Sequence, residues 1–99
     1  MAIEVTSKQR AYLRSLAMKM DPVFQIGKAG LTPEVTKSAE EALAARELIK
    51  GSVLKNCDGD INEMAGILAE RTRSLLVQVV GRKITLYRPA KKPKIELPR

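Results

Sequence analysis

Apolar side chains recur every three or four residues in three stretches of the chain, which is the spacing of an amphipathic helix. Each stretch follows a residue whose short polar side chain suits a helix N-cap, namely Thr6, Thr32 and Asp60. Gln9 and Glu63 stand three residues beyond two of these caps and would complete capping boxes. The pattern therefore predicts three helices, the first of which ends before Asp21-Pro22.

Four shorter stretches have the composition of β-strands: residues 23–26, 48–54, 75–80 and 83–88. The second is interrupted by Gly51, whereas the third is almost continuously apolar, which favours a central position in a sheet. The fourth alternates apolar and polar side chains, as a strand with one wet face does. Gly81-Arg82 separates the last two strands and suits a two-residue hairpin turn.

The predicted order is helix, strand, helix, strand, helix, strand, strand. Strands joined through a helix are expected to pair in parallel by right-handed crossovers, and the hairpin adds one antiparallel strand. We therefore predict an α/β fold, a two-layer sandwich with a mixed four-stranded sheet and three helices. Residues 1–89 are expected to form one domain, and residues 90–99 a basic, proline-containing flexible tail.

Along the second helix, the apolar spacing predicts one buried side, formed by Val35, Ala39, Ala42, Leu43 and Arg46. The first and third predicted helices each have one apolar face, which includes Leu13 in the first and Leu68 in the third. Because the second helix contributes mainly small side chains, it is expected to pack closely on the sheet.

Composition narrows the classes of function for this chain of 99 residues. It has no histidine and a single cysteine, Cys57, which excludes a disulfide framework and an ordinary zinc site, so no cofactor is expected. Without the usual acid–base residue we expect no enzyme and no small-molecule substrate, since a turn and a cap explain Asp58 and Asp60. No apolar run could span a bilayer and no signal peptide is evident, so we expect a cytoplasmic monomer without a membrane partner.

The net charge of +7 is unevenly distributed. Residues 1–30 contain five basic and two acidic side chains, and residues 31–81 contain six basic and eight acidic ones. Residues 82–99 contain seven basic side chains and one acidic one. A positive field concentrated at both ends of the chain favours a partner that carries phosphate groups.

Gly27-Lys28-Ala29-Gly30 lies between the first predicted strand and the second helix. Glycines allow a loop to wrap closely around a phosphate, and the following helix directs unpaired N–H groups towards it. Lys28 supplies a mobile cation. The loop resembles the GxxG loop of KH domains, which grips nucleic-acid backbone, whereas the spacing of a nucleotide-binding P-loop is missing.

Cations far apart in the sequence would meet beside this loop. If the first three strands run in the same direction, their carboxyl ends share one edge of the sheet, where ligands of open α/β sheets bind. That edge would gather Lys28, Lys55, Arg82 and Lys83. Each of these side chains alone is also typical of a solvated loop, but the group favours an anionic ligand.

Four ordered blocks resemble CRM domains, named for chloroplast RNA splicing and ribosome maturation: residues 24–32 (FQIGKAGLT), 45–50 (ARELIK), 77–82 (VQVVGR) and 86–89 (LYRP). Over residues 5–89 the chain is most similar to the bacterial, single-domain YhbY-type group. The resemblance implies a fold like the C-terminal domain of translation initiation factor three and an RNA-binding role for the GxxG loop. It also implies an association with large-subunit precursors in bacteria, while plant members promote group II intron splicing.

Together, the edge and the resemblance give an expected RNA-binding set: Gly27, Lys28, Ala29, Gly30, Thr32, Lys8, Arg10, Arg14, Lys55, Arg82 and Lys83. Aromatic side chains are few, and we expect Phe24 and Tyr87 to pack inside the fold. Recognition should therefore depend on phosphate, 2′-hydroxyl groups and shape more than on base edges. Ribosomal RNA or large-subunit precursor particles are the expected partners.

Other functions remain open at this point. The chain could be a protein-interaction module or a translation-associated module without RNA specificity of its own. Charge alone also fits DNA, although no all-helical triplet suggests a helix-turn-helix.

Overall fold

The computed structural model describes residues 3–98, so residues 1, 2 and 99 of the expected domain and tail lie outside it. Its elements follow the predicted order: α1 (Ser7–Ala17), β1 (Phe24–Ile26), α2 (Pro33–Arg46), β2 (Leu48–Val53), α3 (Ile61–Arg71), β3 (Leu75–Val80) and β4 (Lys83–Tyr87). The strand bounds agree with the prediction to within one residue. Helix α1 ends earlier than predicted, because the N–H groups of Lys19 and Met20 bond to carbonyls only three residues back.

All three predicted N-caps form. The Thr6 hydroxyl accepts the Gln9 N–H at 3.1 Å, and the Gln9 side chain accepts the Thr6 N–H at 2.9 Å, which completes the capping box. The side chains of Thr32 and Asp60 likewise accept the N–H groups of the residues three positions on. At Asp60, Glu63 returns no hydrogen bond within residues 3–98, so only half of that predicted box is present.

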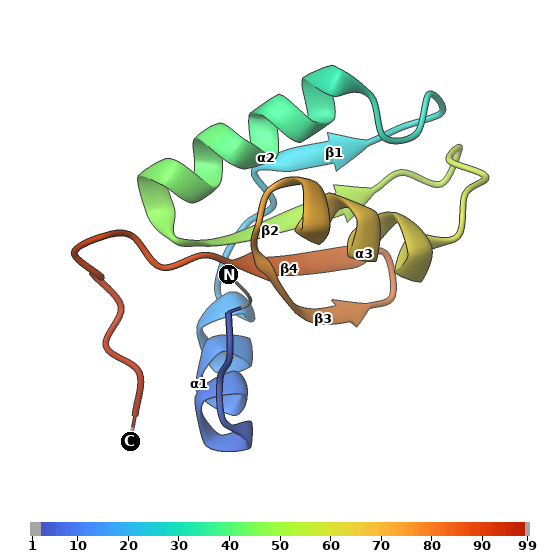
Figure 1. Cartoon of the computed structure of the whole chain (residues 1–99). Coiled ribbons are helices and arrows are strands. Elements are labelled where there is room, and N and C mark those ends of the chain that lie inside the picture. Colours follow the sequence, from blue (N-terminus) through green and yellow to red (C-terminus); the bar gives the residue numbers. More distant parts are fainter. Residues whose placement is uncertain (1–2, 99) are drawn as a thin grey trace.

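The sheet has the order β1-β2-β4-β3, in which β1 and β2 are parallel and β4 is antiparallel to both of its neighbours (Figure 1). The predicted parallel pairing between the second and third strands is therefore wrong, because β4 lies between them. The prediction that residues 75–80 form a central strand is also wrong, since β3 is at the edge. The apolar character of β3 has a different cause, because its side chains join cores on both faces of the sheet, although only Val77 among them is buried.

The two faces of the sheet carry separate hydrophobic cores. Helices α2 and α3 cover one face and form the two layers of the predicted sandwich with it, while α1 packs on the opposite face near one end (Figure 1). In β3, Leu76 and Val79 join the first core, whereas Leu75 and Val77 join the second. The predicted α/β class, with three helices and a mixed four-stranded sheet, is confirmed.

Gly51 is explained by the ring that lies across it. A Cβ atom at Gly51 would stand 2.1 Å from Cζ of Phe24, its partner in β1, so no larger side chain fits in the middle of β2. Phe24 is buried there, and Tyr87 is buried in the second core, as both were predicted to be. Neither ring is therefore available to stack on a base.

Helix α2 and the C-terminal segment meet at Glu47. Arg46, the last residue of α2, is exposed, contrary to the prediction, and Glu47 follows it with a positive φ of 67° at the turn into β2. The buried Glu47 carboxylate accepts the N–H of Lys94. Residues 90–98 form no helix or strand, yet Ile95 and Leu97 pack against the α1-side core. Whereas the sequence predicts a flexible tail, these contacts hold the segment to the domain.

Candidate nucleic-acid interface

The loop Gly27–Gly30 is a tight turn directly after β1. Its ends are joined by the Gly30 N–H, which donates to the Gly27 carbonyl at 2.9 Å, and Gly30 has a φ of 74°. That positive φ favours glycine, because residues with a side chain are strained there. Gly27 has an ordinary φ, and a Cβ added to it would meet the nearest atom, Cδ1 of Leu54, at 3.6 Å. The two glycines therefore differ in how strictly the fold demands them.

The tip of this turn presents unpaired hydrogen-bond donors. Lys28 and Ala29 are exposed, and neither their N–H groups nor the Lys28 ammonium has a partner within residues 3–98. Helix α2 begins just beyond, with Thr32 as its cap and Pro33 in its first position. The loop thus places two free amides and one cation close to the positive end of a helix dipole.

Three segments distant in sequence are tied together beside the loop. The Leu54 N–H donates to the Ile26 carbonyl at 2.8 Å, and the Arg82 guanidinium donates to the Leu54 carbonyl at 3.1 Å. The Val53 N–H also donates to the Arg82 carbonyl at 2.7 Å. Strands β1, β2 and β3 run in the same direction, so their carboxyl ends meet as predicted, although β4 intervenes between β2 and β3. We call this end of the sheet, with residues 27–30, 54–55 and 81–83, the carboxyl edge.

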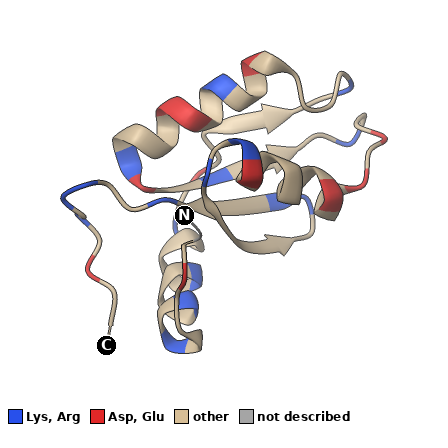
Figure 2. Ribbon diagram, in the orientation of Figure 1, with Lys and Arg blue, Asp and Glu red and all other residues tan. Residues whose placement is uncertain are grey.

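The carboxyl edge contains four basic side chains, and acidic side chains follow in the adjoining loop. Lys28, Lys55, Arg82 and Lys83 are all exposed. Two of them also have protein partners, since Arg82 donates to the Leu54 carbonyl and the Lys83 ammonium bonds to the Ser52 hydroxyl at 3.1 Å on the α1 face of the sheet. Positive φ of 57° at Gly81 confirms the predicted hairpin turn. Asp58 and Asp60 follow Lys55 in the next loop, and Figure 2 shows both signs of charge there. Asp58 and Asp60 therefore offset part of the positive charge on the Lys55 side of this edge.

The α1 cations of the expected set lie elsewhere. Helix α1 packs over Leu48 and Tyr87, at the end of β2 opposite to Val53, roughly 16 Å away along the strand. Lys8 and Arg14 are exposed on this helix. The structure thus separates the expected set into two regions, and Lys8, Arg10 and Arg14 do not join the carboxyl edge.

Arg10 is bound to the protein itself. Its Nη1 donates to the carbonyls of Leu76 at 3.0 Å and Val77 at 2.8 Å, where a bulge interrupts the pairing of β3 with β4. A bulge leaves backbone groups without ladder partners, so the guanidinium satisfies them and joins α1 to the edge strand.

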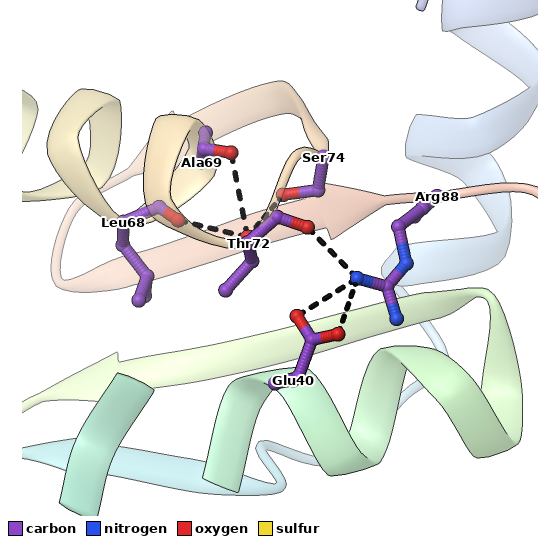
Figure 3. Close-up of polar contacts among 6 residues, drawn as sticks. All are labelled: Glu40, Leu68, Ala69, Thr72, Ser74 and Arg88. Atoms are coloured by element: carbon purple, nitrogen blue, oxygen red, sulfur yellow. Dashed lines mark hydrogen bonds and ion pairs between the residues drawn. The ribbon is translucent and has the colours of Figure 1, made fainter. Parts of the chain in front are cut away.

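A second basic region was not found from the sequence. A groove of about 700 Å³ between α2 and the end of α3 is lined by Lys37, Arg71, Arg73 and Arg88, among others. Figure 3 shows how Arg88 reaches from the end of β4 to Glu40 of α2 and to the carbonyl of Thr72. The close pair of arginines at 71 and 73 was the available signal, but only the packing of α2 beside them makes a groove.

Other kinds of site are not evident within residues 3–98. No group of three or more histidine, cysteine or acidic side chains there could hold a metal ion. None of the described helices has the length and apolar composition needed to cross a membrane. Cys57 is buried, with Sγ 3.8 Å from Sδ of Met64, and belongs to the core.

Comparison with known proteins bears on the same residues. The model of the CRS1 / YhbY (CRM) domain family matches residues 5–88, which include every residue of the expected RNA-binding set. A Bacillus subtilis protein, named probable RNA-binding protein YqeI, is 50% identical over 95 residues, covering 95% of this chain and 99% of that protein. A Haemophilus influenzae protein named RNA-binding protein is 35% identical over 96 residues, or 96% of each chain.

A solved structure agrees in fold. The solution structure of a Staphylococcus aureus hypothetical protein, described as a candidate RNA-binding protein, has a TM-score of 0.81 and 50% sequence identity to this chain. The match covers 96% of this chain and 100% of that one. The family resemblance drawn from four sequence blocks is thereby confirmed.

Proposed function

We propose, because this chain belongs to the CRS1 / YhbY (CRM) domain family, that it is an RNA-binding protein that holds RNA backbone at the carboxyl edge. The observation that carries the proposal is the pair of unpartnered N–H groups at Lys28 and Ala29, beside the Lys28 ammonium. Two unpaired amides and one cation within a single exposed turn are the kinds of donor that bind phosphate oxygens. The names of the relatives, which state RNA binding, support the same conclusion.

The mode of recognition follows from what the carboxyl edge lacks. Residues 27–30, 54–55 and 81–83 include no aromatic side chain, and Phe24 of β1 is buried, so the usual stacking platform for single-stranded bases is missing at this edge. Binding should depend on phosphate contacts, 2′-hydroxyl groups and the shape of a folded RNA. We propose that the protein acts as a monomer, by binding and without catalysis.

The test of RNA binding is the dependence of affinity on salt. Each phosphate contact releases counterions, so the affinity for a folded RNA should fall with a log–log slope on the order of −3 to −6. Fluorescence anisotropy with a labelled ribosomal RNA hairpin measures it, and a DNA hairpin of the same sequence tests the role of the 2′-hydroxyl groups. A flat salt response would contradict the phosphate contacts.

A variant locates the contact. Lys28→Glu reverses the charge at an exposed position without internal partners, so it should weaken RNA binding while leaving the unfolding transition unchanged. Unchanged affinity in this folded variant would show that the loop is not the contact.

For the cellular role, we propose cytoplasmic work on ribosomal RNA during assembly of the large ribosomal subunit, which the family resemblance supports. Sedimentation of a cell extract should place the protein with large-subunit precursors, and crosslinking should recover their RNA. If the protein is absent from those particles but bound to other RNA, the assembly role is wrong and RNA binding stands.

A further inference from the structure

The groove between α2 and the end of α3 is a second concentration of positive charge, outside the expected RNA-binding set. It is lined by Lys37 and Glu40 of α2, by Arg71 and Arg73, and by Arg88 beyond β4. Its volume of about 700 Å³ is large enough for part of a ligand of nucleotide size. Four cations thus face one carboxylate.

That one carboxylate is already paired. Arg88 Nη1 donates to both oxygens of Glu40 at 2.8 Å and to the Thr72 carbonyl at 2.8 Å (Figure 3). These bonds join α2 to the end of α3 and hold the guanidinium in place. Within residues 3–98, the side chains of Lys37, Arg71 and Arg73 have no hydrogen-bond or ion-pair partner. The groove therefore has positive charge that the protein does not neutralise.

Arg73 also has an unusual backbone. Its φ is 54°, in the left-handed region, where it ends α3 with the Ser74 N–H donating to the Ala69 carbonyl at 2.8 Å. Glycine or asparagine is favoured in this position of a helix end. An arginine held in a strained conformation while its side chain lines a charged groove points to a use for the guanidinium.

We infer that this groove binds phosphate groups of the RNA, as a continuation of the contact at the carboxyl edge. The inference rests on the proposed function and extends it to the helical face of the domain. Pro33 lines the groove and is the first residue of α2, three positions after Gly30, so the groove begins within a few residues of the loop. Guanidinium groups suit this ligand, because their donors match phosphate oxygens in pairs.

The test removes two groove charges without straining the fold. In the full chain, Lys37→Gln with Arg73→Asn keeps a residue that tolerates positive φ at position 73. Lys91→Gln with Lys92→Gln removes the same charge from exposed tail positions and is the control. We expect the groove variant to bind the RNA hairpin about fivefold or more weakly, with a salt slope shallower by about 1 to 2, and to melt no lower than the wild type. The tail variant should change affinity less than about twofold.

The outcomes separate this inference from the proposed function. If Lys28→Glu weakens binding and the groove variant does not, the groove inference is overturned and the carboxyl edge stands. If the wild type does not bind RNA, both fail. NMR titration with inorganic phosphate is the second arm: amide shifts around Thr72 with phosphate, but none with RNA, would assign the groove to a free anion and overturn the RNA contact.

Discussion

The two ends of the sheet both have basic side chains, but these side chains differ in their hydrogen-bond partners. At the end covered by α1, Arg10 donates to the carbonyls of Leu76 and Val77, and the Lys50 ammonium donates to the Ala17 carbonyl at 3.3 Å. At the carboxyl edge, Lys28 and Lys55 are exposed and have no such partner within residues 3–98. At the first end, Arg10 and Lys50 satisfy the protein's own backbone; at the second, Arg82 does so through the Leu54 carbonyl, whereas Lys28 and Lys55 stay without a protein partner among the described residues.

The difference shows that net charge does not identify a binding surface. What distinguishes the two ends is whether the donors are already occupied, since a cation bonded to carbonyls must give up those bonds to meet a phosphate. The α1 end should therefore respond to substitution through stability, and the carboxyl edge through RNA affinity.

The largest expected effect is at the α1 end. Leu13 is fully buried against Leu48, Val77 and Tyr87, so Leu13→Ala should lower the free energy of unfolding by about 2–5 kcal/mol. Urea unfolding measures the loss, and RNA affinity measured where the variant is folded should be unchanged. A large loss of affinity under those conditions would mean that α1 takes part in binding.

Removal of the Arg10 guanidinium should have a smaller effect of the same kind. Arg10→Gln leaves two backbone carbonyls with a poorer partner or none, which costs about 1–2 kcal/mol of stability. Arg14→Gln, at an exposed position one turn on, is the matched control and should be nearly neutral in stability. Equal melting of the two variants would contradict a structural role for Arg10.

Substitution of the two loop glycines by alanine should lower the free energy of unfolding by amounts that differ by about 1 kcal/mol. Gly30→Ala places a Cβ at a φ of 74° and should lower stability by about that amount, with a further loss of RNA affinity as the loop shifts. Gly27→Ala meets only an ordinary contact with Leu54 and should be tolerated. Urea unfolding of both variants tests this, and equal stability would show that the turn relaxes freely.

The smallest effect concerns Tyr87. Burial raises the pKa of Tyr87 above its ordinary 10.0, and the nearby charge of Glu47 raises it further. Because the folded state holds this proton more tightly, the stabilisation is complete below pH 10 and is lost as the pH rises through the folded pKa. Urea midpoints between pH 8 and 11 should fall more steeply for the wild type than for Tyr87→Phe. Parallel curves would contradict this linkage.

Much of this architecture is local and could be predicted from the sequence. Caps, turn residues and apolar spacing placed the seven elements, because each depends on neighbours along the chain. The position of β4 between β2 and β3 depends on which strand of the hairpin reaches β2, and both strands are apolar enough to do so. The packing of α1 against β3 could not be predicted for the same reason. Apolar periodicity shows which face of an element is buried, but it does not show which other element covers that face.

Only part of the candidate site could be predicted from the sequence. The GxxG loop and the meeting of the carboxyl ends follow from local motifs and strand direction. The hydrogen bonds of Arg10 and the groove beside Arg73 depend on contacts between residues more than 30 positions apart in the sequence. Residue spacing along the chain does not predict such contacts.

The central claim is that RNA meets the carboxyl edge and not the α1 end. Lys28→Gln with Lys55→Gln and Lys8→Gln with Arg14→Gln each remove two exposed charges, one pair from each region. Salt titrations of RNA binding, with both variants and the wild type, compare them directly. We expect a slope shallower by about 1–2 for the first variant and by less than about 0.5 for the second. Equal slopes, or a larger change for the α1 pair, would contradict it.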